Sequence, residues 1–391
     1  MKKAILIMAG MLTGGSLCWG LGYNNTFTLV NSIGFSWTDN YNQMKTNKNS
    51  TGIITEAPDM SVNVNRENTY ISLHYRPSFL WFTSSEVTRR QTVQHELDAS
   101  LNQFFSPRLS LSANETFRRG VQPELLDRNN ALVLPDTSYM ENTVNGTLGI
   151  QLRKSTRLDA SGRYYIMRYD EESVATNSNY NIISAGLNLR QEVSAATTLS
   201  GNLNYDNTSY RQLNARSAST VSVGAGADHT FGTRLIGNLT GGLQMKQFEA
   251  SISGQNSPYG GFSLTYLFDP RLRLTAGANY SLWEADLAPY ASQERLTAYA
   301  SIGWDISSRV NCSFSGGMTR GKYLSDQVYI TSTGPTTFGG VDTMYQMSAR
   351  LAYQINRYNW VDVSYGHSTA VSDLRPDFDV NAYSVGWRVS F

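Results

Sequence analysis

Apolar and polar residues alternate with a period of two along most of this 391-residue chain. Between residues 271 and 282, Leu272, Leu274 and Ala276 share one parity, and polar residues such as Thr275 stand between them. A period of two places alternate side chains on opposite faces of a β-strand. Segments 235–246 and 296–305 repeat the pattern, and no long stretch after the first 22 residues has a helical period. The chain is therefore expected to be all-β.

A short turn motif recurs between the alternating segments, at spacings of roughly 36 to 49 residues. It reads Ser-Pro-Arg-Leu at 106–109 and Asp-Pro-Arg-Leu at 269–272, with variants at 155–158, 232–235 and 307–310. A propeller blade would need four short strands per repeat, whereas each unit here has length for two long ones. The repeating unit is therefore predicted to be a β-hairpin with a tight turn.

Counting hairpins predicts about eighteen strands, with sixteen as the alternative, in a single antiparallel barrel that an even number can close. The first strand is expected near residues 26–37 and the last near 380–391. The longest connections are expected at 38–58, 118–141, 322–340 and 368–377. Short turns on the periplasmic side and longer extracellular loops are typical of outer-membrane barrels. Tight turns are expected near Asn68, Ser106, Ser155, Ala195, Gly232, Asp269, Ser307 and Asn356.

Composition and aromatic placement favour a membrane barrel over a soluble β-sandwich. Only 16% of residues are charged, against about 25% in ordinary soluble domains. Tyr, Trp and Phe gather near predicted strand ends, as in the aromatic girdles of membrane barrels, which frequency in strands alone would not explain. The residues assigned to these girdles are Trp37, Tyr70, Trp81, Phe82, Phe104, Phe105, Tyr210, Phe231, Phe268, Trp283, Tyr323, Tyr358 and Trp360.

The first 20 residues are expected to be a secretory signal peptide, which leaves residues 21–391 as the barrel. Lys2 and Lys3 precede an apolar run at 4–17, and small residues allow cleavage after Gly20 or Gly22. The run is too short for the ~20 residues of a spanning helix. Cys312 would then stand without a second cysteine for an intramolecular disulfide. The predicted location is the cell outer membrane.

The carboxyl-terminal strand carries a candidate assembly signal. Tyr383, Val385, Trp387, Val389 and Phe391 share one parity and end the chain on an aromatic residue. Such a strand resembles the signal that the outer-membrane assembly machinery recognises, and its unpaired edge allows strand augmentation. That machinery, outer-membrane lipid and lipopolysaccharide are the expected partners.

Three segments carry a family resemblance. Ser-Pro-Arg-Leu-Ser-Leu-Ser at 106–112, and the segments at 57–64 and 71–78, resemble the family of outer-membrane β-barrel porins associated with exopolysaccharide loci. The resemblance covers most of the chain after the signal peptide. It implies a pore and supplies no catalytic residues.

No catalytic or cofactor chemistry is evident in the sequence. His74, His95, His229 and His367 form no metal-ligand pair, and no phosphate loop or nucleophile elbow is present. The net charge of +1 and the lack of a basic cluster argue against nucleic acid as a partner. We therefore expect no cofactor, no metal and no enzyme, and the oligomeric state stays open.

Parity predicts which charged side chains line the lumen, where any function would lie. The two signs nearly balance, so no ion selectivity is predicted. Arg76 and Asp98 are expected nearly opposite one another as a cross-strand ion pair. A passive channel for small hydrophilic or polysaccharide-related solutes is the first hypothesis. A structural or surface-binding barrel plugged by the 118–141 loop is the second, and a hydrolase around His74 and Asp98 is the third. The predicted lumen set is His74, Arg76, Glu96, Asp98, Arg153, Asp159, Arg163, Arg190, Asp206, Asp228, Lys246, Arg273, Asp305, Arg350 and Arg388.

Overall fold

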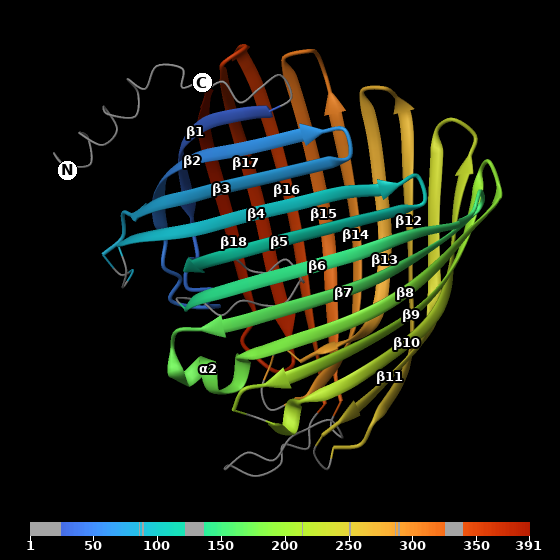
Figure 1. Ribbon diagram of the computed structural model, residues 1–391. Helices are drawn as coiled ribbons and strands as arrows, with labels where there is room; N and C mark the ends of the chain where they lie inside the picture. The colour runs from blue at the N-terminus through green and yellow to red at the C-terminus, as the bar shows by residue number, and fades with distance from the viewer. Residues whose placement is uncertain are drawn as a thin grey trace.

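Eighteen antiparallel strands form one closed sheet in the computed structural model of the protein (Figure 1). Each strand pairs with its neighbours in sequence, and β1 pairs with β18 to close the barrel, with Val30 opposite Ser390 and Thr38 opposite Ala382. The structure describes residues 25–121 except 86, 88 and 89, 137–249 except 213, 252–324 except 286, 288 and 289, and 339–391. The predicted signal peptide lies outside these residues. The eighteen-strand prediction is confirmed and the sixteen-strand alternative is wrong.

The strands are long, between 13 and 17 residues each. They are β1 (Asn25–Thr38), β2 (Thr51–Arg66), β3 (Thr69–Phe82), β4 (Gln91–Ser106), β5 (Leu109–Val121), β6 (Ser138–Arg153), β7 (Thr156–Tyr169), β8 (Tyr180–Ser194), β9 (Thr197–Tyr210), β10 (Ala218–Phe231), β11 (Leu235–Phe248), β12 (Gln255–Asp269), β13 (Leu272–Glu284), β14 (Ser292–Asp305), β15 (Val310–Tyr323), β16 (Gly340–Asn356), β17 (Asn359–Ser372) and β18 (Phe378–Ser390).

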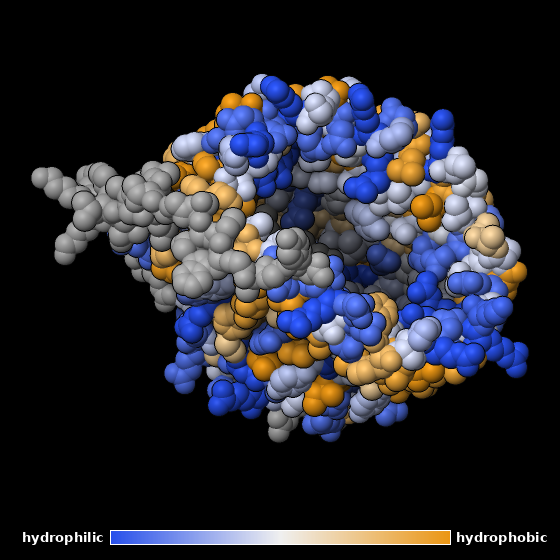
Figure 2. Space-filling model, turned by 45° about the horizontal axis from the view of Figure 1, so that its top comes forward, coloured by the Kyte–Doolittle hydropathy of each residue, from blue (hydrophilic) through white to orange (hydrophobic). Residues whose placement is uncertain are grey.

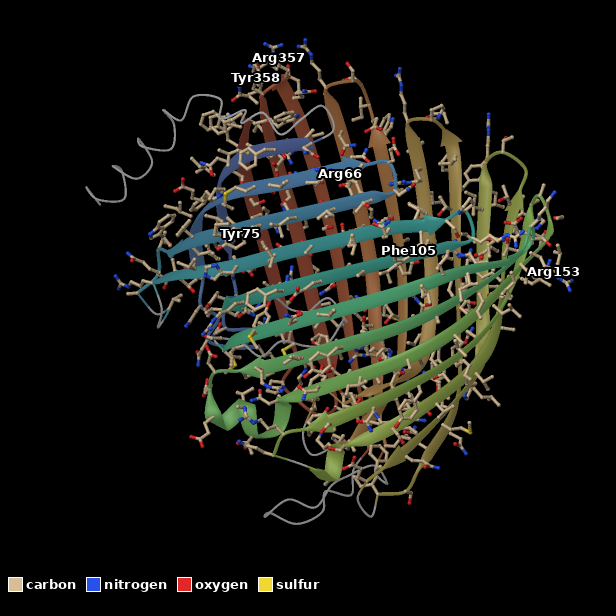
Figure 3. All side chains as sticks on the ribbon, in the orientation of Figure 1. Arg66, Tyr75, Phe105, Arg153, Arg357 and Tyr358 are labelled. Atoms are coloured by element: carbon tan, nitrogen blue, oxygen red, sulfur yellow. The ribbon has the colours of Figure 1, made fainter. Side chains whose placement is uncertain are left out.

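Short and long connections alternate and lie at opposite ends of the barrel (Figure 1). We call these the short-turn end and the long-loop end. The labelled side chains of Arg66, Phe105, Arg153 and Arg357 mark the short-turn end in Figure 3. The helix α2 (Glu172–Ser178) and the 3-10 turn η1 (Asn214–Arg216) belong to connections at the long-loop end. No helix in the described residues is long and apolar enough to cross a membrane.

Strands extend further into two of the predicted loops than the sequence indicated. The strand β2 already begins at Thr51, inside the predicted 38–58 loop, and β17 continues to Ser372, inside the predicted 368–377 loop. In the 118–141 loop, β5 runs to Val121 and β6 starts at Ser138, while residues 122–136 lie outside the described part of the chain. Ladder pairing reaches Thr51, Ser372 and the Val121–Ser138 pair, so the wall is taller than predicted.

The same turn geometry recurs at the short-turn end. The side chains of Asp269 and Ser307 accept hydrogen bonds from the backbone N–H two residues later, at 2.6 and 3.2 Å. The carbonyl of that later residue, Arg271 or Arg309, accepts a bond of 2.8 Å from the next hairpin. Short polar residues stabilise turns in this way. Gly232 adopts a φ of 72°, which glycine tolerates without steric cost.

Parity divides the wall into an apolar outer face and a polar inner face. Leu239, Leu243 and Ile183 are among the most exposed large apolar side chains, at 63%, 59% and 57%. These side chains are exposed in the isolated barrel, and in a membrane they would be covered by lipid. Phe105 and Phe231 are also strongly exposed at the short-turn rim. This distribution indicates an outward apolar band.

Seven of the aromatic residues predicted to lie in the outer girdles have the parity of the inner face instead. Two of them, Tyr70 and Phe104, lie exposed near the short-turn rim. Phe82, Tyr210 and Tyr323 are buried. Trp283 lies under the buried Arg295 guanidinium, and Trp360 lies beside Arg388 on the inner face. Nearness to a strand end says nothing about which face a side chain occupies, and these five pack inside the barrel.

Candidate functional site

The lumen is the candidate site because the polar faces of all strands meet there. Figure 2 shows the molecule hollowed at the short-turn end, with hydrophilic residues around the opening. Its inner wall is not uniform around the circumference. One sector carries paired charges, and another carries hydroxyl groups.

The charged sector lies on β2 to β5. His74 places Nε2 2.6 Å from Asp59 and Nδ1 3.5 Å from Asp98. Beside it, Arg76 pairs with Glu96, whose second oxygen lies 3.9 Å from Arg118. The charges are therefore matched within the wall, as in cross-strand ion pairs.

The predicted pairing of Arg76 with Asp98 is wrong by two residues. Arg76 stands opposite Glu96, and His74 stands opposite Asp98. The connection between β3 and β4 spans residues 83–90, because β3 ends at Phe82 and β4 begins at Gln91. A small change at such a loop shifts every cross-strand partner, since each residue has a fixed place in the register.

The same sector contains a gap in the β2–β3 ladder. Pairing runs from Ile53 to Glu56 and resumes at Met60, while Pro58 and Pro77 occupy the gap. Proline has no N–H to donate to a ladder, so it weakens pairing inside a sheet. Asp59 and His74 cross this junction with a side-chain hydrogen bond, which partly replaces the lost backbone bonds.

The hydroxyl sector lies across β12 to β18. Thr265 and Thr275 approach to 3.3 Å, Ser315 and Ser348 to 2.7 Å, and Ser364 and Ser384 to 2.6 Å. Thr275 stands opposite Ser301, and Ser301 stands opposite Ser315, so one row runs along the ladder from β12 to β16. On β17, Gly366 stands opposite Ser348, so the Ser364–Ser384 pair is separate from this row. These groups offer hydrogen bonds without fixed charge.

Inward glycines do not all leave empty space, contrary to the expectation from sequence. A Cβ on Gly149 would collide with Arg157, one on Gly224 with Tyr259, and one on Gly277 with Tyr299. These long side chains lie flat across the neighbouring glycines instead of projecting into the lumen. At Gly303, in contrast, nothing lies within 4 Å of the added Cβ. Part of the predicted space is open, and part is filled by side chains lying along the wall.

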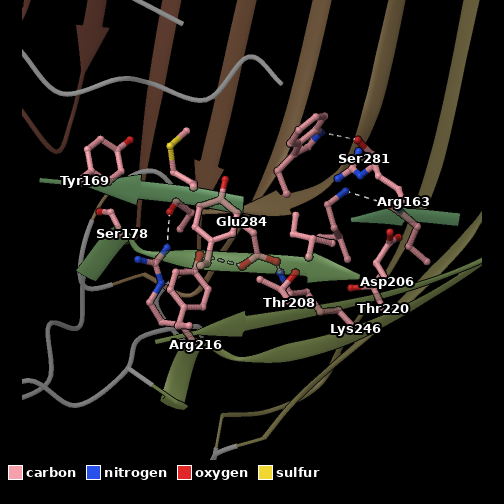
Figure 4. A pocket seen from close by; sticks show the side chains of 18 residues that line it. Arg163, Tyr169, Ser178, Asp206, Thr208, Arg216, Thr220, Lys246, Ser281 and Glu284 are labelled. Atoms are coloured by element: carbon pink, nitrogen blue, oxygen red, sulfur yellow. Dashed lines mark hydrogen bonds and ion pairs between the residues drawn. The ribbon is translucent and has the colours of Figure 1, made fainter. Parts of the chain in front are cut away.

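The long-loop end of the lumen is packed. Lys246 is buried to 2% exposure and places Nζ 2.5 Å from Glu284. Tyr210 donates to the other Glu284 oxygen at 3.3 Å, and Arg216 donates to the Ala285 carbonyl at 2.5 Å. These groups surround a cavity of about 270 Å³, shown in Figure 4. Both signs of charge lie beside aromatic rings there, so the cavity can bind a small polar solute.

Further buried side chains continue this packing around the mouth. Tyr165 and Met167 are fully buried, and Tyr180 contacts both Tyr165 and Tyr210 at ring-centroid distances of 5.6 and 5.3 Å. Across the lumen, Arg295 is 2% exposed and lies 4.9 Å above the Trp283 ring. All of these residues lie toward the long-loop ends of their strands.

Arg163 and Asp206 link the packed end to the middle of the lumen. Both line the 270 Å³ cavity and a second cavity of about 610 Å³ between β6 and β12. Asp206 accepts a hydrogen bond from Ser184 at 2.5 Å, and Arg163 lies 5.7 Å from the Tyr165 ring centre. Both side chains therefore face the inside of the barrel.

The other predicted lumen residues lie nearer the short-turn end. Asp159 pairs with Arg157 at 2.7 Å, Arg190 lies 3.7 Å from Asp228, and Arg350 lies 3.3 Å from Asp362. Arg153 is the last residue of β6 and lies at the rim (Figure 3). Arg273 is the second residue of β13, Asp305 is the last residue of β14, and Arg388 lines a cavity with Arg350.

Sequence reasoning missed several inner residues. Asp59 and Arg157 were not considered although their parity was readable, and Arg118 was assigned to a loop. Arg295 alternates with the apolar residues of β14 and could have been found by the same rule. Arg216 lies in a connection, where no periodicity exists to indicate its position.

The candidate assembly signal lies on the outer face of β18. Tyr383, Val385 and Trp387 are exposed and stand opposite Trp37, Phe35 and Ile33 of β1. Val389 shares their parity, and the Phe391 N–H donates to the Leu29 carbonyl at 2.9 Å. The closing strand therefore depends on this last residue for one backbone bond.

Groups that could hold a metal do not cluster in the described residues, where no three His, Cys, Asp or Glu side chains come together. Outside the barrel wall, the Ser372 N–H and then the Lys45 ammonium hold the pKa of Asp377 below its usual range. The ion pair between Lys45 and Asp377, at 3.1 Å, joins two connections at the long-loop end.

Comparisons with known proteins identify the fold. No protein-family description and no curated protein sequence matches this chain. Among solved structures, the outer membrane protein OpdK from Pseudomonas aeruginosa matches with a TM-score of 0.50 and 11% identity, over 94% of this chain and 99% of that one. OccK8 (OprE) from the same organism matches with a TM-score of 0.50 and 10% identity, over 94% and 98%.

The apoprotein form of the FrpB iron transporter from Neisseria meningitidis also has a TM-score of 0.50, at 10% identity, over 93% of this chain and 81% of that one. At these identities the likeness shows the fold alone. The chain has the closed antiparallel architecture of outer-membrane β-barrels.

Proposed function

We propose that this protein is an outer-membrane channel for passive diffusion of small hydrophilic solutes, wide at its short-turn end and narrow at its long-loop end. The observation that carries the proposal is the polar, hollow lumen of an eighteen-stranded barrel. Barrels of sixteen to eighteen strands are wide enough to hold an aqueous channel. Matched structures include an outer membrane protein and an iron transporter, which agrees with a role in transport.

The location follows from the same features. The outer face of the barrel carries an exposed apolar band that lipid would cover, which supports placement in an outer membrane. By analogy with such barrels, the short-turn end would face the periplasm and the long-loop end the exterior. Lipopolysaccharide and the assembly machinery remain the expected partners, and polysaccharide-related solutes remain one candidate class of cargo.

A hydrolase around His74 has less support. Both ring nitrogens of His74 face carboxylates, at 2.6 and 3.5 Å. A catalytic histidine needs one nitrogen free to take a proton from its nucleophile. Here the two carboxylates occupy both positions, which favours a structural role in the wall.

The second candidate is a barrel whose lumen is closed at the long-loop end. The buried Arg295, Tyr165 and Lys246 favour it, because they already narrow that mouth. Conductance in planar bilayers separates the two functions. We expect ohmic steps from the full-length protein and larger steps when residues 122–136 are replaced by a short linker. Absence of conductance in both proteins would contradict the channel and leave a structural or surface-binding barrel.

A further inference from the structure

A cavity at the short-turn end of the lumen differs from the others in its charge. It measures about 610 Å³ and lies between the turns of the β12–β13 and β14–β15 hairpins and the inner faces of β16 to β18. Four arginines and one aspartate line it: Arg271, Arg309, Arg350, Arg388 and Asp305. The lumen as a whole has nearly balanced charges, so this excess of cations is local.

Three of these arginines have no carboxylate partner within the described residues. Arg350 lies 3.3 Å from Asp362, but Arg271, Arg309 and Arg388 form no ion pair there. The single lining carboxylate, Asp305, already accepts a hydrogen bond from Asn311 at 2.5 Å. Like charges held close together repel, and a bound anion relieves that repulsion.

The turns hold Arg271 and Arg309 in place. The Arg271 N–H donates to Asp269 at 2.6 Å, and the Arg309 N–H donates to Ser307 at 3.2 Å. Their carbonyls accept bonds of 2.8 Å from Asp305 and Gln354 of the following hairpins. Both backbones are therefore fixed from two sides, so each arginine side chain starts from a defined place at the edge of the cavity. The recurring turn motif thereby gains a role beyond reversing the chain.

We propose that this cavity binds solutes bearing two or more phosphate or carboxylate groups as they enter the lumen from the short-turn end. Guanidinium groups bind such oxyanions through paired, charge-assisted hydrogen bonds. The inference rests on the proposed channel and names a class of solute for it. Arg350 and Arg388 lie on the inner wall, so the site faces the lumen and not the surrounding lipid.

The repeated turns provide a matched control. Arg108 has the same geometry as Arg309, with its N–H 3.2 Å from Ser106 and its carbonyl accepting a 2.8 Å bond from Gln151. Arg234 likewise accepts a 2.8 Å bond from Leu267. Neither arginine lines the cavity. The double variant R108Q/R234Q therefore removes the same charge from the same rim as R271Q/R309Q, but leaves the cavity intact.

Binding is measured first by calorimetry, with inorganic tripolyphosphate as the probe and delipidated protein in neutral detergent. We expect R271Q/R309Q to weaken binding at least about tenfold, since hydrogen bonds to charged groups are the stronger kind, and R108Q/R234Q to change it less than about twofold. Circular dichroism and heat-modified gel mobility verify folding of both variants. Absence of binding to the full-length protein, or equal loss in the two double variants, would overturn the proposal.

Conductance in planar bilayers of neutral lipid then tests whether the anion enters the lumen from the short-turn end. Tripolyphosphate should lower conductance when added on the short-turn side and have less effect from the other side. If the protein conducts but neither side responds, the site does not serve entry and the proposal is wrong. Calorimetric binding without any conductance would instead sustain the anion site and contradict the channel. Retention of anionic phospholipid in native mass spectrometry, without tripolyphosphate binding, would assign these arginines to lipid headgroups and overturn the solute site.

Discussion

The two ends of the lumen are built on the same strands but differ in what fills them. At the short-turn end, Gly303 has open space above it and arginines line a wide cavity. At the long-loop end, Tyr165 and Arg295 are fully buried. Strand parity is identical at both ends, so the barrel architecture alone does not set the width of the lumen.

The length of the connections explains the difference. The turn between β12 and β13 has only two residues, so its backbone stays at the rim and only side chains extend over the lumen. The connections before β10 and β14 are longer, and they contribute Arg216 and Tyr290 to the packed end. Long side chains such as Lys246 complete the packing from the wall. Extra chain at one end thus narrows the lumen where the strands would leave it open.

The largest effect should come from breaking the buried ion pair at the packed end. Lys246→Ala leaves Glu284 without its buried cation, which typically costs about 3–5 kcal/mol. Urea-induced unfolding in micelles measures the change in the free energy of unfolding. Lys154→Ala, in a turn at the open end, should change it by less than about 0.5 kcal/mol. Equal costs at the two sites would show that the two ends are not packed differently.

The second effect tests whether the inner and outer faces are assigned correctly. Leu274 lies on the outer face as the third residue of β13, so Leu274→Arg should destabilise the barrel by about 1–3 kcal/mol, between the costs at the interface and at the midplane. Thr275 lies 3.3 Å from Thr265 on the inner face, and Thr275→Arg should be tolerated. Folded yield in liposomes, read from heat-modified gel mobility, measures both. Loss of folding with Thr275→Arg alone would reverse the parity.

Alanine substitutions at two inward glycines should distinguish a crowded part of the inner wall from an open part. A Cβ on Gly242 would clash with the Val223 carbonyl, a backbone atom that cannot move away cheaply. Gly242→Ala should therefore cost about 1–3 kcal/mol, as overpacking does. Gly303→Ala meets nothing within 4 Å and should be neutral or slightly stabilising. Thermal unfolding of the two variants provides the comparison, and a larger loss at Gly303 would count against the open end.

The smallest effect on stability should come from deleting Phe391. The deletion removes one backbone bond, to the Leu29 carbonyl, and one outward side chain, so stability in detergent should fall by less than about 1.5 kcal/mol. Assembly in cells should suffer far more if the strand is the recognition signal. Protease protection in isolated outer membranes measures assembly, and normal insertion of the truncated chain would rule that role out.

The sequence predicted the repeating architecture well because period two and the turn motif are local signals. The tight turns near Ser106, Asp269 and Ser307 were found because short polar residues stabilise them directly. The partner of Arg76 was missed because register across a long connection depends on its length, which no local signal specifies. Phe82 and Tyr323 were misassigned because their position along the strand was used in place of their parity.

The packed mouth was the least predictable part. Arg216 and Tyr290 come from connections, where residues follow no period. Their burial depends on Tyr210, Glu284 and other side chains from strands far apart in sequence. Such packing is a property of the assembled barrel and is visible only in three dimensions.

The most direct test of the central claim is the size of neutral polymer that enters the lumen from each side. Polyethylene glycols of graded size are added to one side of a planar bilayer that holds the full-length protein in known orientation. We expect larger polymers to lower the conductance from the short-turn side, and only smaller ones to do so from the long-loop side. Equal size limits from both sides would contradict a lumen that is wide at one end and narrow at the other.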